Sequence, residues 1–364
     1  MRRYKNKNKY KLIKSDNFDL KKINIGLQLL RTICSFLIVV CHIYDFDRFH
    51  HKIILGKNRY YIITFFYISF YFSYNTLASR NIPKIKGRYK RMLIPYIIWP
   101  LLFYLNDKFN HYFYNKNEMF NYKYLYYQIL TGCKIYGIFW FLFDLIFLTL
   151  FFTIIVFLFK KIFIFVLFIF TIFIYYFFYS NYANILIFNK YKKVPAHHAI
   201  RPNLEFFIFA FTGFYLSSIQ FINKLYKYRI LSSIVSIVSL IFYVKYYNAY
   251  FKKIIFFKGV IRDILVTFFF IIFSMLPFDK IDNVYILNVL NKITSFTGGI
   301  YYIHIKVGEF CKPRIRNVKK GNFKGCCLIY IFCYSICFLG NFIFQKSQLK
   351  FLFIIFFIQI MLIF

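Results

Sequence analysis

The chain has 364 residues, of which 60% are hydrophobic and 25% aromatic, and its mean hydropathy is +0.55. Soluble domains are about 45–50% apolar, so this composition excludes an ordinary soluble fold and indicates a polytopic membrane protein. The net charge of +37 is placed in short runs between apolar segments, which favours membrane topology and contact with lipid headgroups over nucleic-acid binding.

Apolar stretches long enough, or nearly long enough, to cross a bilayer recur along the chain. We predict an all-α, polytopic transmembrane helix bundle of 10 or 11 spans, because the last stretch is short and could lie in the membrane interface instead. The stretches are 25–45, 60–78, 92–106, 136–159, 162–179, 205–222, 229–247, 260–277, 287–305, 326–344 and 349–364.

The basic residues predict the orientation of these spans. Residues 1–22 form a basic tail with nine Lys or Arg, and residues 23–364 form the membrane domain. The connections 79–91 and 223–229 are also basic and fall on the same side as the tail, which predicts a cytoplasmic N-terminus. The basic segment 306–325 falls on the opposite side by simple counting, so a helix near it is re-entrant or the rule fails locally.

The first span carries two ionisable residues, Arg31 and His42. They are eleven positions apart, about three helical turns and about 16 Å, so they lie on one face of the helix. An ionisable pair in such a span is costly and predicts a functional site. Histidine suits general-base or nucleophilic chemistry near neutral pH. The alternative is a packed His42 and an Arg31 that reaches the headgroups.

The second and third spans add further candidates. Arg88 and Arg91 lie three positions apart at a helix start on the cytoplasmic side, and the guanidinium fork suits phosphate oxygens. These arginines could equally be ordinary positive-inside charge. Ser69 lies in the aromatic run 64–74, where it binds a substrate or only its own backbone.

Later spans contain four more candidates. Asp144 follows Trp140 in an apolar run, and a carboxylate within a membrane requires a partner such as a histidine or an arginine, unless it meets water near the helix end. Tyr302 and His304 follow a Gly-Gly pair that allows close backbone approach. His304 is otherwise an interfacial histidine at the end of a span.

No metal site is predicted. The eight cysteines contain no CxxC spacing, and the adjacent histidines His197 and His198 have no third ligand at a typical distance in the sequence. The loops 107–135 and 180–204 are the longest candidates for a surface that faces an acceptor substrate.

In order along the chain, the motifs form a recognisable set: Arg31 and His42, FFYIS, RYKRMLIPYIIW, FWFL and GGIYYIH. This set resembles the acyltransferase-3 family of integral membrane O-acyltransferases, which modify surface polysaccharides and related glycoconjugates. The resemblance covers residues 25–305, and its most specific parts are the first-span pair and the RYKRMLIPYIIW block.

The resemblance implies a ten-helix type of bundle, a cytoplasmic acyl-CoA donor, and a carbohydrate or glycoconjugate acceptor reached from the other side. We expect the bundle to lie in the plasma membrane. Acetyl-CoA is the expected donor. By position, His42 would be the catalytic histidine and Arg31 its companion. Arg88 and Arg91 would contact the phosphates of CoA. The expected partners are membrane lipids and these two substrates.

The chain departs from the family pattern at several positions. Phe70 replaces the usual glycine after the serine, Leu29-Leu30 replace Gly-Leu, and residues 62–64 lack the usual acidic residue. Asp45, Asp47 or Asp144 would have to substitute for that carboxylate, and Asp45 is the nearest candidate because it lies one helical turn from His42. Two alternatives stay open: a transporter or flippase for a glycan or lipid-linked sugar, and a non-catalytic relative of the family.

Overall fold

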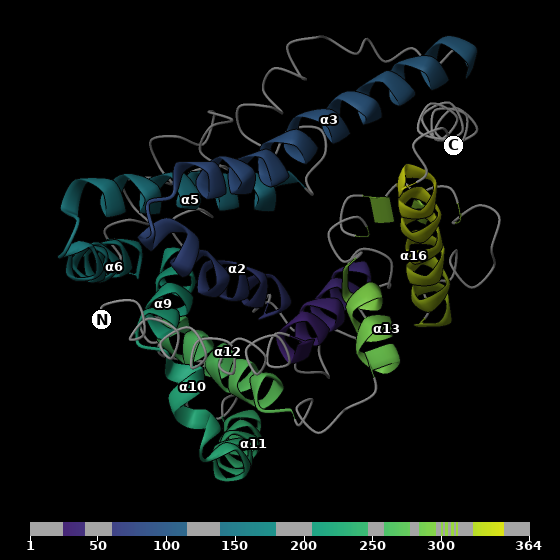
Figure 1. Ribbon diagram of the computed structural model, residues 1–364. Helices are drawn as coiled ribbons and strands as arrows, with labels where there is room; N and C mark the ends of the chain where they lie inside the picture. The colour runs from purple at the N-terminus through teal and green to yellow at the C-terminus, as the bar shows by residue number, and fades with distance from the viewer. Residues whose placement is uncertain are drawn as a thin grey trace, which may run out of the picture.

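The structure is a computed structural model in which the described residues form helices and no strand (Figure 1). The all-α prediction is thereby confirmed for this part of the chain. The described residues are 25–40, 60–114, 139–179, 206–246, 258–276, 284–295, 300, 303–304, 307–308, 311 and 323–345.

The helices follow the predicted apolar stretches closely. The first, Ile25–Val40, is the unlabelled purple helix of Figure 1. The others are α2 (Tyr60–Ala78), α3 (Ile82–Tyr114), α5 (Trp140–Phe159), α6 (Phe163–Tyr179), α9 (Phe207–Ser218), α10 (Phe221–Tyr226), α11 (Arg229–Tyr246), α12 (Lys258–Ser274), α13 (Val284–Ser295) and α16 (Phe323–Gln345).

The segment 79–91 is mostly helical, whereas we predicted a loop there. Helix α3 begins at Ile82, and the backbone N–H of Lys84 donates to the side-chain oxygen of Asn81 at 3.1 Å, a typical N-terminal cap. Hydropathy missed this start because the apolar residues begin only at Met92. The basic residues therefore belong to one helix of 33 residues, which also contains Pro95 and Pro100.

The predicted span 205–222 is divided at its end. Helix α9 stops at Ser218, and Gln220 adopts the left-handed conformation (φ 52°, ψ 40°) before the short helix α10 begins. The left-handed conformation ends α9 and turns the chain. It also strains the backbone, because Gln220 has a side chain.

We expect Gln220→Gly to stabilise the protein by about 0.5–1 kcal/mol, because glycine adopts this conformation without a steric penalty. The measurement is the thermal unfolding midpoint in one detergent, with Gln220→Ala as the control. Equal midpoints for the two variants would show that the turn stores no strain.

Membrane-spanning character is strongest in α5. Among the described helices, only Phe141–Phe159 is both long and apolar enough to cross a bilayer by length and composition. The remaining apolar helices reach 10–17 residues: Ile25–Val40, Phe163–Tyr176, Phe207–Ser218, Arg229–Phe242, Asp263–Ser274 and Lys324–Phe338. The count of 10 or 11 spans stays a prediction.

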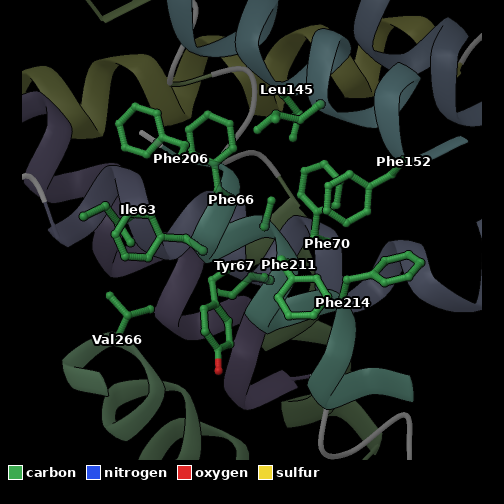
Figure 2. Packing of buried hydrophobic residues seen from close by; sticks show 14 of the residues in the cluster. Ile63, Phe66, Tyr67, Phe70, Leu145, Phe152, Phe206, Phe211, Phe214 and Val266 are labelled. Atoms are coloured by element: carbon green, nitrogen blue, oxygen red, sulfur yellow. The ribbon is translucent and has the colours of Figure 1, made fainter. Parts of the chain in front are cut away.

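Helix α2 forms the centre of the core and packs against α9, α5 and α12. Aromatic rings fill these contacts (Figure 2): Phe66 stacks on Phe206 with ring centroids 4.6 Å apart, and Phe70 packs on Phe152 at 4.7 Å. Contacts from Phe66 to Phe206 and from Tyr74 to Phe214 join α2 to α9 at two positions.

The first helix lies on the other side of α2, beside α13 and α16 (Figure 1). Thr294 of α13 donates to the side-chain oxygen of Gln28 at 2.6 Å. The rings of Phe36 and Tyr330 pack edge to face with centroids 5.3 Å apart. Helices α13 and α16 thus hold the first helix, which precedes His42 in the sequence.

Candidate functional site

The predicted site residues Ser69 and Arg88 meet inside the bundle. The Nη2 group of Arg88 donates to the Ser69 hydroxyl at 3.1 Å and to the Thr149 hydroxyl of α5 at 3.4 Å. Its guanidinium also lies 5.8 Å from the ring centroid of Phe70, within the range of a cation–π contact. One arginine of α3 therefore joins α2 to α5.

The electrostatics of Arg88 favour an anionic ligand. Its Nε atom is buried and has no hydrogen-bond partner among the described residues. Burial, and then the positive charge of Arg91, lower the pKa of the Arg88 guanidinium to about 10. The group therefore stays protonated at neutral pH, where two uncharged hydroxyls solvate it. A guanidinium with an unused N–H group is suited to bind phosphate or carboxylate oxygens.

Arg91 occupies a different environment from Arg88. Its side chain is exposed, although it lies near enough to affect the ionisation of Arg88. The two residues share the side of α3 that we predicted, but only Arg88 enters the bundle. An anion bound there would meet one buried and one solvated positive charge.

Thr149 is a site residue that sequence analysis missed. It is fully buried, accepts from Arg88, and its hydroxyl also lies 4.0 Å from the sulfur of Met92. One turn further along α5, Thr153 contacts the hydroxyl of Tyr89 at 3.1 Å. The available signal was the spacing of Thr149 and Thr153 by four residues in a largely apolar helix, since this spacing places two hydroxyls on one face.

Arg31 lies on a face of the Ile25–Val40 helix that is turned toward protein. Leu27, four positions earlier, and Cys34, three positions later, share that face and are buried in the core. Cys34 shares a hydrogen bond with Thr64 of α2. Arg31 itself is half-buried. This position is consistent with the prediction that Arg31 faces the interior of the bundle. The catalytic role of Arg31 stays a prediction.

His304 is fully buried within the protein. Its Nδ1 is 3.2 Å from the carbonyl oxygen of Ile300, and because a carbonyl only accepts, Nδ1 carries a hydrogen. Ile300 and Ile303 pack in one cluster with Val39 of the first helix. The late motif therefore packs on the C-terminal end of the first helix, at Val39.

Asp144 is buried in α5. The alternative in which it contacts water near the helix end is therefore wrong. Trp140 begins α5, but its side chain lies outside the described set, as do His42, Asp45 and Tyr302 altogether. In the part of the chain that the structure describes, no group of three His, Cys, Asp or Glu residues could hold a metal ion. Among the predicted site residues that the structure describes, a hydrogen bond joins Arg88 to Ser69.

Two of the positions that depart from the family pattern, Phe70 and Thr64, make contacts between helices. Phe70, where the family pattern has glycine, supplies the ring beside Arg88. Thr64, within the segment that lacks an acidic residue, contacts the first helix through Cys34. Phe70 therefore adds a contact to a predicted site residue, and Thr64 adds one between α2 and the first helix.

Comparison with known proteins gives one match. Residues 24–318 match the family model described as "Acyltransferase domain", which covers most of the chain. No curated protein and no solved structure matches. The match begins just before the helix that contains Arg31 and includes α2, α3 and α5, which meet at Arg88. The chain therefore belongs to acyltransferase family 3, a family of membrane proteins.

Proposed function

We propose that this chain transfers an acyl group, in the first place acetyl, from cytoplasmic acyl-CoA to a hydroxyl of a carbohydrate or glycoconjugate. The acyl-CoA part of the proposal is supported by Arg88, a half-buried, protonated side chain whose buried Nε–H has no hydrogen-bond partner among the described residues, and by the solvated Arg91 near it. Such a pair suits the phosphates of CoA, and family membership supplies the reaction class.

The proposed topology places the donor and acceptor on opposite sides of a plasma membrane. The N-terminus is cytoplasmic, and α3 begins on the same side with its basic residues. Arg88 and Arg91 would hold the CoA phosphates there, so that the thioester extends into the bundle toward Arg31 and His42. The acceptor would approach from the other side, through the loops that precede α5 and α9.

The proposed chemistry depends on His42. Its imidazole takes the proton of the acceptor hydroxyl, the hydroxyl oxygen attacks the thioester carbonyl, and the C–S bond breaks. The proton then passes to the CoA thiolate. In the other form of the mechanism, His42 itself carries the acyl group between two such steps. Arg31 supports the negative charge that develops, and Asp45 orients the imidazole.

We expect His42→Ala to reduce acetyl-CoA turnover by about 10²- to 10⁴-fold, the usual contribution of a general base. Arg31→Ala should also lose transfer. The measurement is hydrolysis or transfer of labelled acetyl by purified protein in detergent, with His51→Ala as the matched control and the unfolding midpoint as the check on folding. Full activity of His42→Ala would remove this mechanism. Failure of the unchanged protein to bind acetyl-CoA by calorimetry would favour the non-catalytic relative, and vesicle uptake of a glycan without CoA would favour the transporter.

A further inference from the structure

A second polar cluster lies on α2, α9 and α12 and has no part in the proposed reaction. Asp263 of α12 is 2.8 Å from the hydroxyl of Thr212 in α9 through Oδ2. Thr267, one turn further along α12, is 3.0 Å from the hydroxyl of Tyr67 in α2. In Figure 2 the Tyr67 hydroxyl extends away from the aromatic core around Phe66 and Phe70. The cluster is embedded in otherwise apolar helices.

The hydrogens available to this cluster can be counted. The Thr212 hydroxyl lies 2.9 Å from the carbonyl oxygen of Ile208 and 2.8 Å from Asp263 Oδ2. A threonine hydroxyl has one hydrogen, and a carbonyl oxygen has none. If Thr212 donates to Ile208, the contact with Asp263 is a hydrogen bond only when the carboxyl group carries the proton.

The neighbouring contacts follow the same rule. Thr267 donates to the backbone oxygen of Asp263 at 2.8 Å, which uses its only hydrogen, so Tyr67 is the donor to Thr267. Neither Thr267 nor Tyr67 has a hydrogen left for the carboxyl group of Asp263. The acid must therefore donate to Thr212, or accept from it at the expense of the bond to Ile208.

The charges near Asp263 do not favour a carboxylate. Its Oδ1 is buried and has no hydrogen-bond partner among the described residues. The described groups that face it are Thr212 from α9 and Tyr67 from α2, and neither is a cation. Helix α11 also packs on α12, and its described basic residue, Arg229, bonds to Tyr226. A buried carboxylate with a single hydroxyl partner pays a large desolvation cost.

We propose that Asp263 is a proton-binding site: it is a neutral carboxylic acid whose Oδ2–H donates to Thr212 and thereby joins α12 to α9. The folded chain then keeps a proton that the unfolded chain releases near pH 4. Because the folded state binds more protons, stability falls as the pH rises above that value, until the folded acid itself ionises. Over that interval the unfolding equilibrium constant rises about tenfold per pH unit.

The test compares the unfolding midpoints of the unchanged protein and of Asp263→Asn from about pH 4 upward, through the interval in which the folded acid keeps the proton that the unfolded chain has released. Asparagine donates to Thr212 through its amide and does not ionise. We expect the unfolding midpoint of the unchanged protein to fall with rising pH relative to Asp263→Asn, with the smallest difference at the acidic end. Parallel profiles would overturn the proposal, since they would show a permanently ionised carboxylate.

Two further measurements keep the test decisive. The infrared C=O stretch of a protonated carboxyl group should be present at about pH 5 and absent in Asp263→Asn, and its absence in the unchanged protein would contradict a neutral acid. Arg262 precedes Asp263 in the sequence. Arg262→Gln should leave the pH profile unchanged, whereas a new pH dependence in that variant would identify an ion pair and overturn the proposal.

Discussion

Replacing Arg88 by alanine is expected to raise the KM for acetyl-CoA at least about tenfold, because each lost contact between a guanidinium and a charged ligand is worth about 1.5–3 kcal/mol. Arg88→Lys should recover little of this loss. A lysine has no second branch with which to contact Ser69, Thr149 and a phosphate together. The measurement is initial-rate kinetics with acetyl-CoA as the varied substrate.

The matched comparison is Arg91→Ala, which removes an exposed charge from the same helix. Because solvent screens that charge, its loss should cost less and should become negligible at high salt, while the Arg88 defect should persist. Thr149→Val should give an intermediate KM, since Arg88 would keep the contact with Ser69. Equal defects in the Arg88 and Arg91 variants at all salt concentrations would contradict a distinct role for the buried arginine.

Gly213→Ala is expected to destabilise the protein by at least about 3 kcal/mol, at the upper end of the cost of overpacking. A Cβ atom added to Gly213 would lie 2.2 Å from the backbone carbonyl oxygen of Tyr67, and no side-chain rotation can relieve a backbone clash. Helices α2 and α9 would have to move apart along the most extensive helix contact of the core. Thermal unfolding in detergent measures the loss.

Gly87→Ala is the control for the intrinsic effect of alanine. Gly87 also lies inside a helix, but a Cβ added there meets nothing within 4 Å. We expect this variant to gain about 0.5–1 kcal/mol from the higher helix propensity of alanine. If both glycine variants shifted the unfolding midpoint in the same direction, the close contact between α2 and α9 would not control stability.

Hydropathy and charge predicted much of the helix layout, because both are local properties of the chain. The starts and ends of α5, α6, α11 and α16 lie within a few residues of the predicted stretches. Hydropathy failed where a different local signal decides the boundary. Asn81 caps α3 before its apolar part begins, and the backbone turns at Gln220 inside an apolar stretch.

The sequence by itself determined the helical class, the family, and the candidate roles of Arg31, Ser69 and Arg88. Only the tertiary structure showed that Arg88 turns inward while Arg91 stays exposed, and that Thr149 completes the contact. The physical reason is that hydropathy gives the length of a helix but not its rotation or its neighbours. The contact of Arg88 with Thr149 joins residues 61 positions apart, and that of Tyr67 with Thr267 joins residues 200 positions apart. Such pairs form only when packing selects which helices meet and which faces they present.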